Sequence, residues 1–171
     1  AKMRNLFGDM IEAAAIAILK ASDVKIDDEQ KRVKYKFDGG EIDGTYDVKI
    51  EGRIWDIKSA SPMSFDYKFG DRGGFDALLK HDDFGYVTQG YLYSNAEECD
   101  FGGWIVINKS TGEWCITETP IADNEHNKNA IQKAKDNIEA LKTNAPFKRC
   151  FTDTEEYFYR KKTGNRVLKS T

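Results

Sequence analysis

The stretch 41-EIDGTYDVKIEGRIWDIKSA-60 decides the fold, because polar and apolar residues alternate on both sides of the pair Glu51-Gly52. A two-residue turn that ends in glycine favours a tight hairpin. We therefore expect one strand over 41–50 and a second, antiparallel strand over 53–60. The second strand is mostly apolar, which indicates a central position in a sheet.

The same hairpin carries a group of charged side chains. Residues two apart on a strand share a face, so Asp43 and Asp47 share a face of the first strand, and Asp56 and Lys58 share a face of the second. The turn sets Asp47 opposite Asp56. Carboxylates gathered at one point repel one another unless a cation lies between them, and oxygen ligands without Cys or His select Mg²⁺ or Mn²⁺. The alternative is an ordinary solvated face, but a central strand would instead place these groups in a cleft.

The remaining elements follow from periodicity along the chain. We expect helices over 3–20, 75–80, 83–95, 123–142 and 153–162, a strand over 32–37, a loop over 61–74 and a second hairpin over 102–120. This order predicts an α/β or α+β fold, in which helices cover a mixed sheet.

Composition limits the class of protein. The chain has 171 residues, of which 40% are hydrophobic, and a net charge of -3. This length suits one domain with its own core, so we expect a single domain over 1–171. No apolar run approaches the length of a bilayer span, so no membrane partner is expected. Three scattered cysteines indicate a reducing compartment and hence a cytoplasmic location.

Two further features stand out on the predicted helices. Glu12 interrupts the apolar run MIEAAAIAIL and lies on or beside the buried stripe of its helix. A carboxylate there needs a partner, and a metal shared with the hairpin would be one. Gln89 and Tyr93 are four residues apart, so both project from one face of their helix.

Together these residues resemble the RecB-like branch of the PD-(D/E)xK nuclease superfamily, which includes phage exonucleases of the lambda type and CRISPR-associated adaptation nucleases. The resemblance extends over residues 4 to 142. It is carried by Glu12 on the leading helix, GEID at 40–43 for GxxD, DIKS at 56–59 for (D/E)xK and QGYLY at 89–93 for QxxxY. Four motifs in the right order are more specific than any one of them. The fold implied is a restriction-endonuclease-like mixed sheet with helices on both sides.

The resemblance also implies an activity and a set of site residues. The activity is that of a metal-dependent deoxyribonuclease, an exonuclease of phage or bacterial recombination and repair, with DNA as substrate and a homo-oligomer or a recombination protein as partner. The implied catalytic residues are Glu12, Asp43, Asp56 and Lys58. The implied ligands of Mg²⁺ or Mn²⁺ are Glu12, Asp43, Asp56 and the carbonyl of Ile57, and the implied substrate-binding residues are Gln89, Tyr93 and Ser59.

The GxxD motif selects Asp43, whereas hairpin register alone selects Asp47. We prefer Asp43, which strand twist or a bulge near Gly44 would bring to the metal, and keep Asp47 as a neighbour of the ligand shell. Many relatives carry an iron-sulfur cluster near the C-terminus. This chain has only Cys150 there, so no such cluster is expected.

Two other functional classes stay open. One is a non-catalytic DNA- or partner-binding module on the same fold. The other is a glycosidase with Asp43 and Asp56 as its acid and base, which explains neither Lys58 nor Glu12. The aromatic residues Phe65, Tyr67 and Phe69 follow Lys58 in segment 61–82 and either stack on bases or pack as satellite core.

Overall fold

The computed structural model describes residues 2–80, 82, 85–120 and 124–143. Its helices are α1 (Lys2–Ala21), α2 (Pro62–Ser64), α3 (Phe75–Lys80), α4 (Tyr86–Ala96) and α5 (Asn124–Lys142), with a π-helical turn η1 (Phe65–Phe69). Its strands are β1 (Ile26–Phe37), β2 (Gly40–Ile50), β3 (Arg53–Ala60), β4 (Asp100–Asn108) and β5 (Trp114–Glu118). The strands form one sheet in the order β1-β2-β3-β4-β5.

The sheet is mixed, and β3 lies at its centre. β3 pairs antiparallel with β2 and parallel with β4, while β4 and β5 are antiparallel. A parallel pair needs a long crossover, and here α2, η1, α3 and α4 fill it. The expected α+β architecture and the central position of the DIKS strand are both confirmed.

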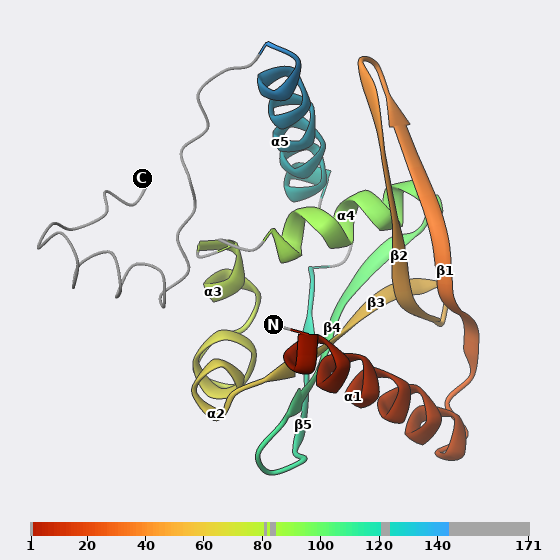
Figure 1. The fold of residues 1–171 in the computed structure, drawn as a ribbon, viewed down its shortest axis with the longest axis vertical. Coiled ribbons are helices and arrows are strands. Elements are labelled where there is room, and N and C mark those ends of the chain that lie inside the picture. The colour runs from red at the N-terminus through yellow and green to blue at the C-terminus, as the bar shows by residue number, and fades with distance from the viewer. Residues whose placement is uncertain (1, 81, 83–84, 121–123, 144–171) are drawn as a thin grey trace, which may run out of the picture.

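Helices cover both faces of the sheet, as expected (Figure 1). On one face, α1 packs its buried Ala15 and Ile16 against Ile57 and Ile105. On the opposite face, α4 contributes to a larger core made of the buried residues Ile54, Trp104, Val106, Val87 and Tyr91. Successive side chains of β3 therefore point to opposite faces of the sheet, and each packs against either α1 or α4 but not both.

Two expectations about local structure are wrong in part. β1 begins at Ile26 rather than at residue 32, because the polar segment before it pairs with β2 although it shows no alternation of its own. Segment 61–74 is not simply a loop, since it contains α2 and η1. The helix expected over 153–162 lies outside the described residues.

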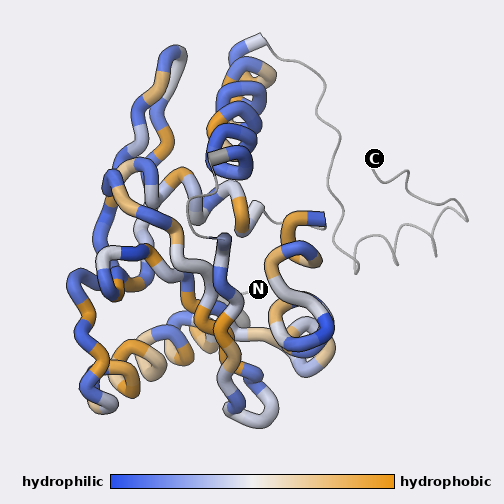
Figure 2. Tube along the Cα trace, turned by 180° about the vertical axis from the view of Figure 1, so that it is seen from behind, coloured by the Kyte–Doolittle hydropathy of each residue, from blue (hydrophilic) through white to orange (hydrophobic). Residues whose placement is uncertain are grey.

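The long β1–β2 hairpin projects beyond the other strands and is supported by α5 (Figure 1). Ile138 of α5 lies so close to Gly40 that a Cβ there would be 3.0 Å from its Cδ1, and Lys142 donates a hydrogen bond to the carbonyl of Gly39. Most of α5 is hydrophilic (Figure 2). The helix therefore contacts its neighbours through a narrow stripe that includes the buried Ala130 and Ala134.

Gly90 of α4 packs tightly against the sheet, whereas Gly8 of α1 faces open space. A Cβ added at Gly90 would overlap the ring of Phe101, whereas a Cβ at Gly8 of α1 meets nothing within 4 Å. We expect Gly90→Ala to lower the free energy of unfolding by about 1–3 kcal/mol, the usual cost of overpacking. Gly8→Ala should raise it by up to about 1 kcal/mol through helix propensity. Urea denaturation measures both; equal effects of the two substitutions would contradict this packing.

Candidate functional site

The site forms where β2 separates from β3. The ladder between them consists of Val48↔Trp55, Lys49↔Ile54 and Ile50↔Arg53, and beyond Trp55 the described part of β3 has no backbone partner on the β2 side. The edge of the strand that carries DIKS is therefore open, in the sense that its backbone is unpaired on the β2 side.

A sharp twist in β2 at this point directs Asp47 into the gap. Val48 packs in the core beneath α1, but Tyr46 packs in the core beneath α4. Residues two apart on a regular strand would share a face. Because its neighbours face opposite layers, Asp47 points sideways toward β3, where its Oδ2 accepts a hydrogen bond from the backbone N–H of Ile57 at 2.6 Å. A carboxylate thus takes the place of the missing strand partner.

Asp47 and Asp56 are carboxyl groups whose pKa values are both raised above the ordinary value. Burial, followed by the charge of Asp56, raises the pKa of Asp47 to about 8. Burial likewise raises the pKa of Asp56, against the opposing effect of Lys58. The charge of Glu12 raises both pKa values further. The site therefore disfavours negative charge, which is the condition that a bound cation would relieve.

Lys58 supplies the positive charge of this cluster. Its Nζ donates a hydrogen bond to Asp56 Oδ1 at 2.7 Å, and both side chains are largely buried, with exposed fractions of 24% and 15%. Burial alone would lower the pKa of Lys58, but Asp56, Asp47 and Tyr86 outweigh it and raise that pKa. In this arrangement Lys58 is an ammonium group.

The structure places Asp43 away from this cluster. Asp43 accepts a hydrogen bond from Arg32 at 2.5 Å on the exposed part of the hairpin, and that guanidinium holds the pKa of the carboxyl below its ordinary value. The bulge expected near Gly44 is absent: register is continuous there, and the described irregularity lies between Ile26 and Asp28. The carboxylate beside Asp56 is Asp47, the one that hairpin register selects.

The sequence contains a signal for Asp47 that the motif comparison overlooked. The GxxD spacing occurs twice in succession, as GEID at 40–43 and as GTYD at 44–47. The second copy has a structural reason for its glycine, because a Cβ at Gly44 would overlap the hydroxyl of Tyr93. Gly44 therefore gives Tyr93 room to lie against β2.

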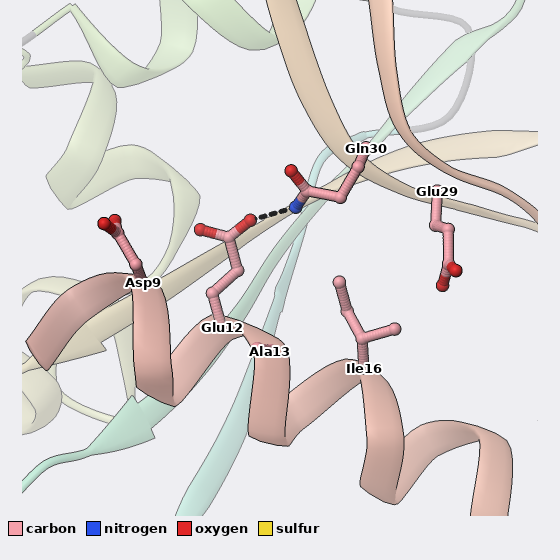
Figure 3. Close-up of a pocket in the computed structure, with 6 residues that line it drawn as sticks. All are labelled: Asp9, Glu12, Ala13, Ile16, Glu29 and Gln30. Atoms are coloured by element: carbon pink, nitrogen blue, oxygen red, sulfur yellow. Dashed lines mark hydrogen bonds between the residues drawn. The ribbon is translucent and has the colours of Figure 1, made fainter. Parts of the chain in front are cut away.

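Glu12 lies near the pair without joining it. Its carboxylate accepts a hydrogen bond from the amide of Gln30 on β1 (Figure 3). Within the described ranges, no three His, Cys, Asp or Glu side chains lie close enough together to hold a metal ion. The convergence of three carboxylates is therefore not present; two converge, and the third acts on them through its charge.

The donor set still fits a hard divalent ion. Asp47 and Asp56 supply carboxylate oxygens, and Ile57 directs its carbonyl to the same side as its N–H, because both groups of a strand residue face the same neighbour. Mg²⁺ is commonly held by one or two carboxylates together with waters and substrate phosphates. The residues that would hold the ion are thus Asp47, Asp56 and Ile57, with Glu12 within electrostatic range.

The residues expected to bind substrate are distributed differently. Gln89 donates a hydrogen bond to the hydroxyl of Tyr93 at 2.9 Å, and this pair lies against Gly44. Ser59 is half-buried and, as the next residue on the strand, faces the opposite way from Lys58. The helix residue that reaches Lys58 is Tyr86, the first residue of α4, whose ring centroid lies 5.3 Å from the ammonium.

Tyr86 was not singled out from sequence as part of the site. It precedes the QxxxY motif and is one of several aromatic residues in its helix, so spacing alone does not mark it. Its ring also packs near Phe69 of η1, with centroids 6.4 Å apart. Two aromatic residues of η1 differ in their surroundings. Phe69 is buried in the core, whereas Tyr67 is 54% exposed and its hydroxyl accepts a hydrogen bond from Arg72.

Comparison with solved structures finds a similar fold in the protein SSO0001, with a TM-score of 0.52 at 14% sequence identity, over 97% of this chain and 72% of that one. A protein from Eubacterium rectale named "Putative exonuclease" aligns with a TM-score of 0.47 at 19% identity, over 84% of this chain and 54% of that one. No protein-family model and no curated protein sequence matches the chain. The likeness to SSO0001 concerns the fold alone. Among the described helices, none combines the length and apolar character that crossing a membrane requires.

The raised pKa of Asp47 predicts a pH-dependent loss of stability. In the folded protein this carboxyl binds its proton up to about pH 8, but its ordinary pKa is 3.8. The metal-free protein should therefore lose stability as pH rises from about 4 to about 8. Asp47→Asn keeps an oxygen acceptor for Ile57 and removes the titration. In EDTA we expect the variant to be more stable at pH 8 by on the order of 2 kcal/mol, with a small difference at pH 4.5.

Urea denaturation at the two pH values measures this effect. Asp43→Asn is the matched control, because its exposed carboxyl has a lowered pKa and should give no gain at pH 8. A stability difference between Asp47→Asn and the wild type that does not change with pH would contradict the assignment.

Proposed function

We propose that the protein is a divalent-metal-dependent nuclease that hydrolyses phosphodiester bonds in DNA. The observation that carries the proposal is the cluster of Asp47, Asp56 and Lys58 on the open edge of β3. Two carboxylates and a backbone carbonyl suit Mg²⁺ or Mn²⁺, and an ammonium group beside them suits a phosphate oxygen. The resemblance of the DIKS and QGYLY segments to nuclease motifs supports the same conclusion.

Each group has a distinct role in this proposal. A bound divalent ion would supply Lewis-acid activation of water and of the phosphoryl group. Asp47 and Asp56 would hold it, and the hydrogen bond from Ile57 would fix the orientation of Asp47. Lys58, held as an ammonium by Asp56, would stabilise charge that develops on the phosphoryl oxygens.

The choice between the two aspartates of β2 is open to direct test. Asp47→Asn should weaken Mn²⁺ binding by at least roughly 10-fold, since loss of an outer-shell partner already costs that much, and should abolish cleavage of linear DNA. Asp43→Asn should leave both near wild type, because its carboxylate pairs with Arg32. Calorimetric titration with Mn²⁺ and a cleavage assay with and without EDTA measure these effects. The reverse pattern would assign the site to Asp43.

The mode of digestion is tested with DNA topology. We propose an exonuclease, on the strength of the family resemblance, so linear DNA should be shortened to small products while covalently closed circles persist. Rapid nicking of the circles at the same enzyme concentration would show that a strand end is not required. Mn²⁺ binding without cleavage of either substrate would favour a non-catalytic DNA-binding module.

Lys58 and Tyr86 should act together in turnover. Lys58→Ala should lower the cleavage rate by roughly 10²-fold or more, the scale of a positioned catalytic group. Tyr86→Leu removes the ring over the ammonium and should lower the rate by roughly 3- to 30-fold, whereas Tyr86→Phe keeps the ring and should stay near wild type. Steady-state cleavage rates at saturating Mn²⁺ decide the matter; equal losses in both Tyr86 variants would point to the hydroxyl instead.

A further inference from the structure

Gln30 has an unusual backbone for its place in the fold. Four non-glycine residues have positive φ among those the structure describes, and Gln30, at +49°, is the one inside a strand; Asp23, Glu51 and Glu98 lie in turns. Such a conformation is unfavourable for a residue with a side chain and persists where the surroundings enforce it. Such residues are often found at functional sites.

The strained residue lies at the level of the site. The pairs Glu29↔Val48 and Lys31↔Tyr46 flank it, which sets Gln30 opposite Asp47. At this point the side chains of β1 switch from one face of the sheet to the other, as those of β2 do.

Glu29 accepts a hydrogen bond from Lys20 of α1, and Lys31 donates one to Glu97 just beyond the end of α4. Because these two residues of β1 would share a face of a regular strand, the reversal occurs at Gln30.

The side chain of Gln30 reaches Glu12. The amide Nε2 donates to Glu12 Oε1 across a cleft of about 370 Å³ between α1 and β1 (Figure 3). The hydrogen bond engages one carboxylate oxygen, and the other makes no hydrogen bond to any described residue. A helix and an opposing strand are thereby joined beside the Asp47–Asp56 pair.

We propose that Gln30 is a positioning residue for the metal site, which uses its left-handed backbone to hold Glu12 beside Asp47 and Asp56. The inference rests on the proposed metal-dependent function and adds a residue that lies outside the motifs of the resemblance. One oxygen of Glu12 is fixed by the amide, and the second remains available to a cation or its bound water. Carboxylates at metal sites are commonly oriented by such outer hydrogen bonds.

The test separates positioning from folding. Gln30→Gly removes the amide but suits a positive φ, so the protein should be as stable as wild type or more stable. Its Mn²⁺ affinity should nevertheless fall roughly 10-fold, as should that of Gln30→Asn, which tolerates the backbone but is one methylene too short to reach Glu12. Gln132→Ala is the matched control, because that exposed glutamine donates to Asp136 on α5 and should leave the affinity unchanged.

A double-variant cycle shows whether Gln30 acts through Glu12. Glu12→Gln should also weaken Mn²⁺ binding, and adding Gln30→Gly to it should cause no further loss. Calorimetric titration measures affinity, and urea denaturation measures stability.

Wild-type affinity in Gln30→Gly, or losses that add fully in the double variant, would overturn the role of Gln30 and leave the proposed function standing. Absence of Mn²⁺ binding by the wild type would overturn both.

Discussion

The site depends on one constraint, the separation of β2 from β3 after the pair Val48↔Trp55. A continued ladder would satisfy the N–H of Ile57 with backbone and leave no room for a side chain between the strands. The twist that ends the ladder turns Asp47 into the plane of the sheet, where it replaces that backbone partner. The same twist carries the rest of the β1–β2 hairpin away from β3 and toward α4 and α5. The open edge, the carboxylate pair and the projecting hairpin are thus consequences of a single backbone feature.

The charges around that edge are balanced within a small volume. Asp56 is neutralised by Lys58, and the ring of Tyr86 lies against the same ammonium. Among the described residues, no cationic side chain donates a hydrogen bond to Asp47, and burial and the neighbouring Asp56 raise its pKa. Unfavourable charge of this kind is found mainly at functional sites and is uncommon elsewhere in a protein. Glu12 adds to the unfavourable charge from the other layer of the fold.

Much of this arrangement could be predicted from sequence. Alternation around Glu51-Gly52 predicted the hairpin, and its register placed Asp47 opposite Asp56. The motif comparison nevertheless favoured Asp43, because GxxD recurs after four residues. A shift of four preserves the two-residue period of a strand, so the hydrophobic pattern cannot distinguish Asp43 from Asp47. The contacts of Gln30 with Glu12 and of Tyr86 with Lys58 depend on backbone twist and on tertiary packing, which leave no local signature in the chain.

The hydrogen bond between Ile57 and Asp47 has a spectroscopic consequence. Amide protons in the middle of a sheet ordinarily report on the backbone carbonyl opposite them. The amide of Ile57 is bound instead to a titrating side chain, at the centre of the DIKS strand. Its nitrogen and proton chemical shifts will therefore follow the charge on Asp47, and its solvent exchange will follow the opening of a single side chain. Isotope labelling of isoleucine would restrict the spectrum to the isoleucine amides, and the assigned resonance of Ile57 among them would report the charge on Asp47.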